Sequence, residues 1–383
     1  MKGLKTSTAS FIFIVVLGIT SCKKEAAIRT IDKTIGINCP RLASLTTVKS
    51  NVLYTVTTYA GADYTSETLP IEGNIIDGVL CDARFIRPDG IAISPDGIIY
   101  IADKIGNVRR IDTKGMVSTF AGKTDGSYFD SGNVDGPGTI AKFWRPTDMI
   151  LGKDGYLYVV DQFYGHIRKI SPSAQVSTLI SSLRGFADYK NGPLSEAQFV
   201  DEFYSLASGP DNSIYLVESN NLIRKVSPDG IVSTFAGQTP DYGYPIIGYQ
   251  DGPKENALFG GISNIAFAPD GSLYLCDAEN IKLRKITVAG VVESVTDLIE
   301  PVEYWTGASM AISNQGIIYL SNSSQIFKVD ADGIAQLVAG GRTSEHKDGV
   351  GTQARFRGIN NMAIYKNYLY LTDGSTVRRM NIE

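Results

Sequence analysis

The sequence predicts an all-β protein that forms a ring of six four-stranded sheets, a six-bladed β-propeller. Three observations predict this architecture: one strand motif recurs six times, short strands and glycine-containing turns fill the intervals between its copies, and the last copy stops one strand early. The composition agrees, because 39 glycines and 20 tyrosines in 383 residues are typical of a chain with many turns and strands.

The recurring motif is a short apolar strand that contains a tyrosine and ends in a polar, usually acidic, residue. Its six tyrosines lie 45 to 59 residues apart and are Tyr100, Tyr158, Tyr215, Tyr274, Tyr319 and Tyr370. A repeat of this length is typical of a propeller blade. Six copies fill residues 52–383 and leave no room for a second domain.

Each copy of the repeat reads as four strands separated by turns. In the first copy the expected strands are 90–93, 98–101, 107–111 and 116–120. The turns between them contain Pro95-Asp-Gly97 and Thr113-Lys-Gly115, which are residues that favour turns. The first two strands are apolar almost throughout, as expected for sheets that are packed on both faces.

The last copy lacks a fourth strand, because the chain ends shortly after the third strand at 376–380. The strand at 52–61 matches the fourth strands of other copies, such as 116–122 and 231–237. We therefore expect the N-terminal strand to complete the last blade, which would remove the open edge that a ring would otherwise leave.

The repeat resembles the NHL repeat, most clearly in Pro88-Asp-Gly-Ile-Ala92 followed by Tyr100-Ile-Ala-Asp103 and Asn107-Val-Arg-Arg-Ile111. The fifth copy departs from this pattern, with Asn322 in place of the acid and Phe327 in place of the arginine. The resemblance covers residues 52–383 and implies a six-bladed propeller. NHL proteins are binding scaffolds more often than enzymes, although a fold alone does not fix a function.

Residues that recur in every blade are interpreted as structural. The polar residues that end the second strands are expected to accept hydrogen bonds from the turn that follows; they are Asp103, Asp161, Glu218, Asp277, Asn322 and Asp373. The arginines of the third strands are expected to lie between blades with paired charges; they are Arg109, Arg168, Arg224, Arg284 and Arg378. A box of Asp-Gly or Asn-Gly, followed eight residues after the Asp or Asn by phenylalanine, recurs five times and predicts a loop pinned to the core.

The N-terminus resembles the signal of a bacterial lipoprotein. A basic start precedes an apolar run from Phe11 to Ile19, which is too short to cross a membrane. Ile19-Thr-Ser-Cys22 follows and resembles a lipobox, which implies acylation of Cys22 after removal of residues 1–21; an ordinary secretory signal is the alternative. Residues 22–51 would then be the lipidated cysteine and a flexible tether. The expected location is the cell envelope, at the outer membrane, with membrane contact only through the lipid.

The other three cysteines and the charge exclude several classes of protein. Three cysteines cannot form a complete disulfide framework; Cys276 reads as a core residue, and a bridge between Cys39 and Cys81 is left open. A net charge of −4 argues against a nucleic-acid partner. Two histidines leave no room for a three-histidine zinc site, and no catalytic motif is present, so catalysis is not the favoured function.

Long loops between the fourth strand of one blade and the first strand of the next carry aromatic residues that the repeat does not require. These loops are expected to gather on one face of the ring, around the mouth of its channel. Such aromatics suit a glycan or a protein segment, and the alternative is that they pack their own loops. The candidate ligand-binding residues are Tyr128, Phe129, Tyr189, Tyr242, Tyr244, Tyr249, Tyr304 and Trp305.

The channel mouth is the second candidate site. The residues that open the first strands are expected to converge there; beside Gly90 they are Asp148, Ser205, Asn264, Ser309 and Asn361. One carboxylate with amide and hydroxyl oxygens is compatible with calcium, which is the only cofactor considered, and related lactonases use acidic and Asn ligands in such a channel. The alternatives to a binding module are therefore a metal-dependent hydrolase or lactonase and a structural scaffold for protein docking. A water-filled polar channel without a ligand is also consistent with these residues.

Overall fold

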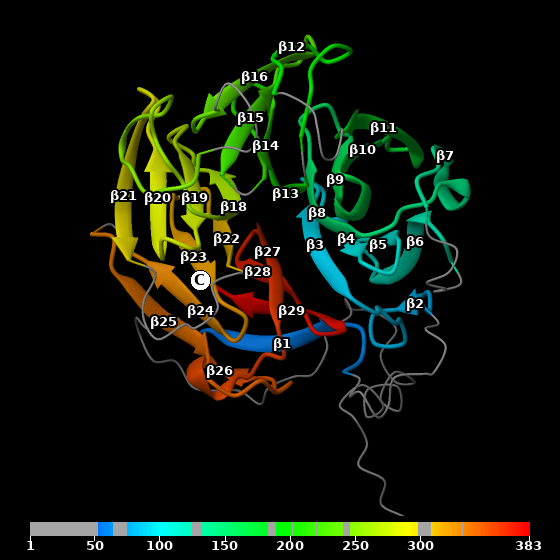
Figure 1. The fold of residues 1–383 in the computed structure, drawn as a ribbon. Helices are drawn as coiled ribbons and strands as arrows, with labels where there is room; N and C mark the ends of the chain where they lie inside the picture. Colours follow the sequence, from blue (N-terminus) through cyan, green and yellow to red (C-terminus); the bar gives the residue numbers. More distant parts are fainter. Residues whose placement is uncertain are drawn as a thin grey trace, which may run out of the picture. The chain divides into compact units, whose positions relative to one another are not determined.

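A computed structural model describes residues 53–63, 75–124, 132–182, 189–200, 202–219, 221–239, 246–297, 308–330 and 332–383. These residues form an all-β ring of six sheets, the predicted six-bladed β-propeller (Figure 1). No helix in the described ranges is both long and apolar enough to span a lipid bilayer.

Blades 1 to 3 each contain five strands. Blade 1 consists of β2 (Gly78–Val79), β3 (Pro88–Ile93), β4 (Ile99–Asp103), β5 (Asn107–Ile111) and β6 (Met116–Gly122). Blade 2 consists of β7 (Gly136–Pro137), η2 (Gly138–Ile140), β8 (Pro146–Leu151), β9 (Leu157–Asp161), η3 (Gln162–Tyr164), β10 (His166–Ile170) and β11 (Gln175–Ser181). Blade 3 consists of β12 (Gly192–Pro193), β13 (Phe203–Ser208), β14 (Ile214–Glu218), β15 (Leu222–Val226) and β16 (Ile231–Ala236).

Blades 4 to 6 complete the ring. Blade 4 consists of β17 (Gly252–Pro253), β18 (Ile262–Phe267), β19 (Leu273–Asp277), β20 (Lys282–Ile286) and β21 (Val291–Asp297). Blade 5 has four described strands, β22 (Ser309–Ile312), β23 (Ile318–Ser321), β24 (Gln325–Val329) and β25 (Ala335–Gly340). Blade 6 consists of β26 (Gly349–Val350), η4 (Gly351–Gln353), β27 (Ile359–Tyr365), β28 (Tyr368–Asp373), β29 (Thr376–Asn381) and β1 (Thr55–Ala60).

Five blades carry one more strand than the sequence predicts. The glycine of each Asp-Gly or Asn-Gly box begins a two-residue strand that pairs with the fourth strand, as Gly78 pairs with Val117 and Val79 with Met116. The box therefore adds a short edge strand before the chain returns to the axis. Because this strand pairs with an outer edge that would otherwise expose unpaired backbone groups, it shields each blade against association through that edge.

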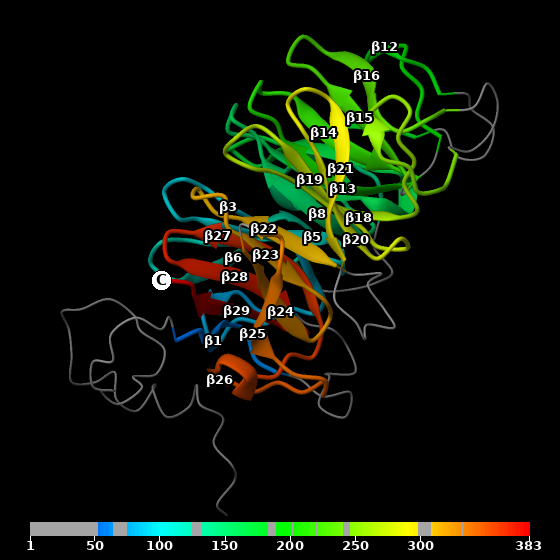
Figure 2. The same cartoon turned by 90° about the vertical axis from the view of Figure 1, so that its left-hand side faces the viewer.

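The N-terminal strand closes the ring as predicted. β1 pairs antiparallel with β29, with Val56 opposite Met380 and Thr58 opposite Arg378. It also pairs with β26 on its other side, so β1 lies inside the sheet of blade 6. The two views in Figure 1 and Figure 2 both place β1 beside β29. The last blade is thus built from both ends of the repeat region.

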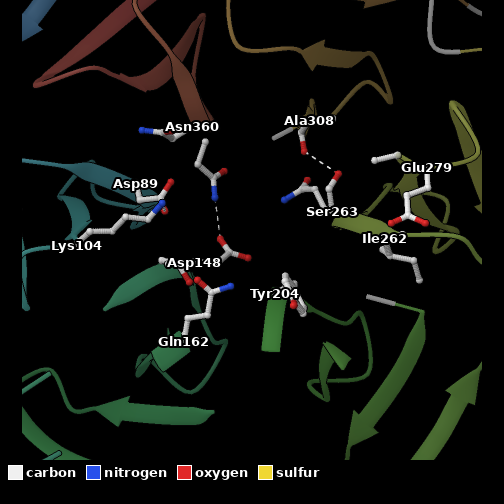
Figure 3. A pocket seen from close by; sticks show the side chains of 15 residues that line it. Asp89, Lys104, Asp148, Gln162, Tyr204, Ile262, Ser263, Glu279, Ala308 and Asn360 are labelled. Atoms are coloured by element: carbon white, nitrogen blue, oxygen red, sulfur yellow. Dashed lines mark hydrogen bonds and ion pairs between the residues drawn. The ribbon is translucent and has the colours of Figure 1, made fainter. Parts of the chain in front are cut away.

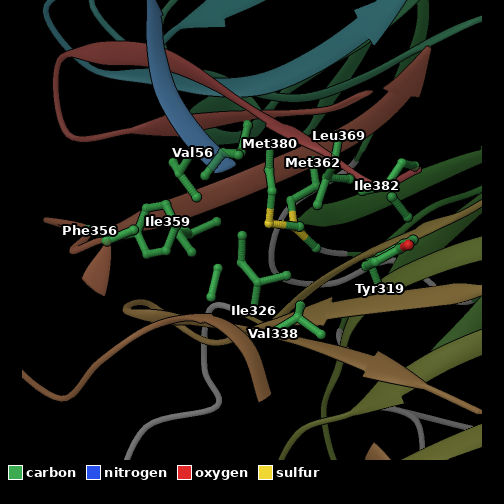
Figure 4. Close-up of a cluster of buried hydrophobic side chains, with 14 residues drawn as sticks. Val56, Tyr319, Ile326, Val338, Phe356, Ile359, Met362, Leu369, Met380 and Ile382 are labelled. Carbon is green, nitrogen blue, oxygen red and sulfur yellow. The ribbon is translucent and has the colours of Figure 1, made fainter. Parts of the chain in front are cut away.

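Apolar side chains fill the interfaces between neighbouring blades. The cluster between blades 5 and 6 contains Val56, Tyr319, Phe356, Met362 and Met380, all at most 4% exposed (Figure 4). The other clusters also join residues from consecutive blades. Because each blade buries its apolar faces only against its neighbours, the closed ring is what completes the core.

Each repeated arginine is fully buried, and its polar partners come from its own blade. Arg284 donates to the Asp277 carboxylate at 2.9 Å and to the Asp251 carboxylate at 2.7 Å, and it also donates to the carbonyl oxygens of Leu258 and Gln250 at 2.6 Å. Its guanidinium lies 4.8 Å from the ring centre of Phe259. We call this group of arginine, strand-two acid, box Asp or Asn and box phenylalanine the arginine cluster.

The arginine cluster recurs in five blades, so the separate repeated residues of the sequence form a single unit. Its arginines are 0% exposed and are Arg109, Arg168, Arg224, Arg284 and Arg378. The box partners that accept from them are Asp77, Asp135, Asn191, Asp251 and Asp348. Only the phenylalanine reaches the preceding blade; Phe259, for example, packs with Val217 and Ala236. The expected paired charges are confirmed, but the partners come from the arginine's own blade and not from a position between blades.

The strand-two acids mainly bind the segment before the first strand, and Asp103 also accepts from the amide of Ile105 in the turn ahead, as expected. Asp277 accepts hydrogen bonds from the amides of Gly260 and Gly261, which precede the first strand, at 3.0 and 3.2 Å. The acids of blades 1, 2, 3 and 6 bind the corresponding amides. Each acid therefore fixes the entry of the chain into its own blade. Only Asn322 follows the prediction fully, because it accepts from the turn amides of Ser324 and Gln325.

The arginine cluster predicts how substitutions in blade 4 change stability. Arg284→Phe leaves the buried Asp277 carboxylate without its cation, and we expect it to lower the free energy of unfolding by about 3–5 kcal/mol. Asp277→Asn combined with Arg284→Phe copies blade 5, and we expect the double variant to be more stable than Arg284→Phe alone. Chemical denaturation of the wild type, of Asp277→Asn and Arg284→Phe alone, and of the double variant measures this coupling. Strictly additive losses would contradict it.

Candidate functional site

The first strands of the six blades surround the axis of the ring, in the order β3, β8, β13, β18, β22 and β27, with β27 returning to β3. Side chains near the start of these strands form a hydrogen-bonded girdle across the channel. Its members are the predicted channel-mouth residues Asp148, Ser205, Asn264, Ser309 and Asn361.

The girdle is continuous from blade to blade. The Ser205 hydroxyl donates to Asp148 and accepts from the Asn264 amide at 3.3 Å. The Asn264 carbonyl oxygen accepts from the backbone amide of Met310, next to Ser309, at 3.1 Å. The Ser309 hydroxyl donates to the Asn361 carbonyl oxygen at 3.2 Å, and the Asn361 amide donates to Asp148 at 2.8 Å.

Gly90 lets the girdle close across blade 1. The hydrogen bond from Asn361 of blade 6 to Asp148 of blade 2 passes the position that Gly90 occupies in blade 1. A Cβ atom on Gly90 would lie 2.7 Å from the carbonyl oxygen of Thr147 and 2.9 Å from the Cα of Asp148. The missing side chain therefore allows β3 and β8 to approach closely, and it leaves room for Asn361 to reach the carboxylate of Asp148.

Asp148 is the one acid of the girdle, and both of its oxygens are hydrogen-bonded. The backbone amides of Met149 and Leu206 donate to it at 2.9 and 2.8 Å, in addition to Ser205 and Asn361. Burial raises the pKa of Asp148 from 3.8 to about 6, and the four donors oppose this rise by stabilising the carboxylate. The group therefore titrates close to neutral pH.

A cavity of about 260 Å³ lies above the girdle, on the face that holds the long loops (Figure 3). Its walls come from residues at the start of the first strands and from the turns that follow the second strands. Polar members other than the girdle are Asp89, Lys104, Thr147, Gln162, Tyr204, Ser263, Glu279 and Asn360. Figure 3 shows Asp89, Gln162, Tyr204, Glu279 and Asn360 around a common space with Asp148.

Only one lysine lines this cavity, and it is paired. Lys104 forms an ion pair with Asp89, and the backbone carbonyl of Asp89 accepts from the Thr372 hydroxyl at 2.6 Å. Burial raises the pKa of Asp89, while the neighbouring Lys104 acts in the opposite direction. The remaining acids at the cavity are Asp148 and the exposed Glu279. The walls are thus polar and carry more carboxyl groups than cations.

A second cavity of about 200 Å³ lies on the other side of the girdle. It shares Asp148, Asn264 and Asn361 with the first cavity but is otherwise lined mostly by apolar residues from the later parts of the first strands, such as Met149, Met310 and Met362. Asp148, Asn264 and Asn361 of the girdle therefore line both cavities and lie between them.

The residues of the channel fit a calcium ion poorly. Calcium takes six to eight oxygen ligands, usually including several carboxylates. Asp148 already receives four hydrogen bonds, and Asp89 is paired with Lys104. Within the described ranges, no three His, Cys, Asp or Glu side chains gather closely enough to hold a metal. No metal-assisted step is therefore derived for this site.

Two of the predicted loop aromatics lie in described residues, and both contact the arginine clusters. Tyr249 donates to or accepts from the Ser294 hydroxyl at 2.6 Å, and the Arg284 guanidinium lies 5.0 Å from its ring centre. Tyr189 contacts the Ser219 hydroxyl at 3.3 Å and lies 5.9 Å from Arg224. Neither lines the upper cavity. The other six lie outside the described residues: Tyr128, Phe129, Tyr242, Tyr244, Tyr304 and Trp305.

The sequence prediction missed the cavity walls supplied by the turns after the second strands. Lys104, Gln162 and Glu279 each lie one or two residues after a strand-two acid. A signal was present, because these turns vary between blades far more than the residue that precedes them, which is acidic in five of the six blades. The predicted channel-mouth residues, in contrast, were brought together as expected.

Comparison with known sequences finds partial relatives. No family model matches the chain. It is 27% identical over 228 residues to Teneurin-3 of Danio rerio and 27% identical over 234 residues to Teneurin-m of Drosophila melanogaster. These matches cover 55% and 56% of this chain but only 8% of each teneurin. The chain thus spans less than a tenth of the length of each of these two teneurins.

Comparison with solved structures supports the propeller fold. A protein of unknown function from Bacteroides thetaiotaomicron superposes with a TM-score of 0.59 at 14% identity, covering 86% of this chain and 76% of that one. An auxiliary nutrient binding protein from Bacteroides ovatus gives 0.57 at 14% identity, with 85% and 76% covered. A gluconolactonase from Xanthomonas campestris gives 0.50 at 12% identity, with 78% and 86% covered. The neighbours therefore include both nutrient-binding and lactonase propellers, and at these identities they share the fold alone.

The pKa of Asp148 provides a test of the girdle. A folded-state pKa of about 6, above the ordinary 3.8, means that the side chain favours folding most below pH 3.8 and that this contribution is lost as the pH rises through 6. Asn361→Leu removes a donor to the carboxylate, so we expect the pKa to rise further. Titration of the Asp148 carboxyl carbon by NMR measures both values. Asn360→Leu is the control and should leave the midpoint unchanged; an ordinary pKa in the wild type would contradict the girdle.

Proposed function

We propose that the propeller is a non-catalytic binding module of the NHL type, which binds a glycan end in the cavity above the girdle. The observation that carries this proposal is the cavity itself: a polar compartment of about 260 Å³, open on the long-loop face and floored by Asp148, Asn264 and Asn361. A ligand on that face meets the hydrogen-bonding groups of the girdle at the bottom of the cavity.

The chemistry of the walls favours a neutral, polyhydroxylated ligand. Glu279 supplies acceptors, Gln162 and Asn360 supply amides with both donors and acceptors, and Ser263 supplies a hydroxyl. Sugar hydroxyls donate and accept in the same way. The carboxyl groups disfavour phosphates and other anions, because the one lining lysine, Lys104, is already paired with Asp89. Tyr204 adds an aromatic surface beside these polar groups.

The size of the cavity limits what it can hold. Pockets for drug-sized molecules are about 300–1,000 Å³, so a cavity of about 260 Å³ is suited to a single sugar residue. A longer glycan would therefore place its terminal residue in the cavity and continue across the face of the ring. The nutrient-binding propeller among the structural neighbours is consistent with such a role.

Binding in the cavity can be tested with a panel of methyl glycosides of common hexoses and N-acetylhexosamines, measured by saturation-transfer NMR and calorimetry. Glu279 is exposed in a turn, so Glu279→Ala should leave the fold intact. We expect it to raise the Kd of a bound glycoside at least tenfold, which corresponds to about 1.4 kcal/mol. Ser208→Ala, in the lower cavity, is the matched control and should change little.

Three results would contradict this proposal. They are an unchanged affinity in Glu279→Ala, binding of lysine-containing peptides in place of every glycoside, and calcium-dependent hydrolysis of a sugar lactone. The last would favour the lactonase alternative, and peptide binding would favour the protein-segment alternative. Repeating the titrations with calcium and with a chelator separates these outcomes.

We further propose that this module is held at the outer membrane by acyl chains on Cys22. The lipobox-like Ile19-Thr-Ser-Cys22 supports this proposal, and these residues lie outside the described ranges. Attachment of several chains at one cysteine gives stable anchoring, whereas a single chain would be marginal.

Metabolic labelling tests the anchor. Cys22→Ala should abolish incorporation of labelled palmitate and release the protein from the membrane fraction, because the acyl acceptor is lost. Cys39→Ala, which leaves the lipobox unchanged, should be labelled as the wild type is. Palmitate incorporation into Cys22→Ala would show that a residue other than Cys22 is acylated.

A further inference from the structure

Three aromatic side chains of blade 2 form a platform beside the upper cavity. The rings of Trp144 and Phe163 are stacked, with centres 4.5 Å apart and planes 20° apart. The Tyr164 ring meets Phe163 nearly at a right angle, with centres 5.3 Å apart. Phe163 is 43% exposed, Tyr164 is 37% exposed and Trp144 is partly exposed. We call these three residues the aromatic platform.

The platform is held rigidly by the arginine cluster of blade 2. Asp161 accepts the backbone amide of Trp144 at 3.1 Å and begins the turn that contains Phe163 and Tyr164. The amide of Gln162 donates to the carbonyl oxygen of Arg145 at 3.0 Å, which ties the two segments together. Tyr164 also stacks on the buried ring of His166. The rings are therefore ordered before any ligand arrives, which reduces the entropy cost of binding.

The repeat itself does not require these rings. The residues that correspond to Trp144 in the other blades with an arginine cluster are Ile86, Val200, Gly260 and Arg357. The turn of blade 2 is also one residue longer than that of blade 1, between Asp161 and His166 compared with Asp103 and Asn107. Burial of the blade core does not explain the platform, because two of its three rings are exposed on the face of the ring.

The platform is continuous with the cavity along the chain. Gln162 lines the cavity and Phe163 is the next residue, while Thr147, another lining residue, lies three positions after Trp144. A ligand that ends in the cavity and leaves it past Gln162 therefore meets an exposed aromatic ring. The polar groups of the cavity would then bind the end of the ligand, and the aromatic platform would contact the neighbouring unit of the same ligand.

We infer that the aromatic platform is a second carbohydrate subsite, on which a pyranose ring of the same glycan stacks outside the cavity. The carbon-bearing face of a pyranose is flat and apolar, and its edge carries hydroxyls. The Phe163 ring offers a surface for the face, and the perpendicular Tyr164 supplies a wall with a hydroxyl for the edge. This inference rests on the proposed function, because the cavity supplies the first subsite.

Trp144 allows the inference to be tested by fluorescence. The chain has two tryptophans, so Trp305→Phe leaves Trp144 as the only one, and because Trp305 is itself a candidate binding residue the affinity of this background is first compared with that of the wild type by calorimetry. In this background we expect tetrasaccharides of the methyl glycoside that binds the cavity, from the cello-, malto-, manno- or chito-series, to change the Trp144 emission saturably. We expect them to bind at least tenfold more tightly than the methyl glycoside, which occupies the cavity alone.

Variants of Phe163 distinguish stacking from general apolar contact. Phe163→Leu should raise the Kd of the tetrasaccharide at least fivefold and leave that of the methyl glycoside unchanged. Phe163→Tyr keeps an aromatic ring and should retain tight binding. Thermal unfolding of both variants checks that the fold is preserved, and because Phe163 is 43% exposed and lies outside the blade core we expect melting temperatures close to that of the wild type.

The outcomes separate the two proposals. Equal affinities for tetrasaccharide and methyl glycoside, or a tetrasaccharide affinity that Phe163→Leu leaves unchanged, would overturn the second subsite while the cavity site stands. The second subsite would also be overturned if Glu279→Ala lost methyl glycoside binding while Phe163→Leu bound the tetrasaccharide as tightly as the wild type. Failure of every glycan to bind would overturn both the subsite and the proposed function.

Discussion

A guanidinium group that is fully removed from water is the constraint on which the rest of this propeller depends. Arg284 and its four counterparts are 0% exposed, so the charge of each must be balanced within the protein. The partners come from the end of the second strand, from the box that precedes the first strand, and from backbone carbonyls. One side chain thus fixes the position of three separate segments of each blade.

The arginine cluster also accounts for features that lie far from the charge itself. The carboxylate that binds the arginine also binds the amides at the entry to the first strand, so it orients the residues that line the channel. Blade 5 has no buried arginine at this position. Phe327 packs in an apolar cluster there, and Asn322 accepts hydrogen bonds from the amides of its own turn. Blade 5 therefore differs from the other five blades at the two positions, 322 and 327, that would otherwise carry the acid and the arginine.

Much of the fold could be predicted from the sequence because the repeat is regular. The spacing of the strand-two tyrosines predicts the number of blades, and the match of residues 52–61 to a fourth strand predicts the closure of blade 6. The convergence of Asp148, Ser205, Asn264, Ser309 and Asn361 followed from their common position. The partners of the acids could not be predicted, because an acid after a strand can bind the turn ahead or the segment 16 residues behind.

The candidate site was harder to predict than the fold, because its walls come from positions where the blades differ. Lys104, Gln162 and Glu279 occupy equivalent turns but share no residue type, so no pattern marks them as neighbours. The rings of Tyr189 and Tyr249 show the opposite case: they stand out in the sequence but lie over the buried arginines of their own blades. Variation between blades, rather than aromatic content, marks the residues that line the cavity.

The closure of blade 6 has a mechanical consequence. β1 lies between β26 and β29 and is antiparallel to both, so its hydrogen bonds run across the direction of the strand. A pull on the chain that precedes Thr55 would act along β1 and load these bonds together in shear, instead of opening them one after another. The strand that fastens the ring would then also resist tension applied through the N-terminus. Under load, we expect the first blade to open to be another one. Blade 5 is expected to open first, because its described residues contain no arginine cluster.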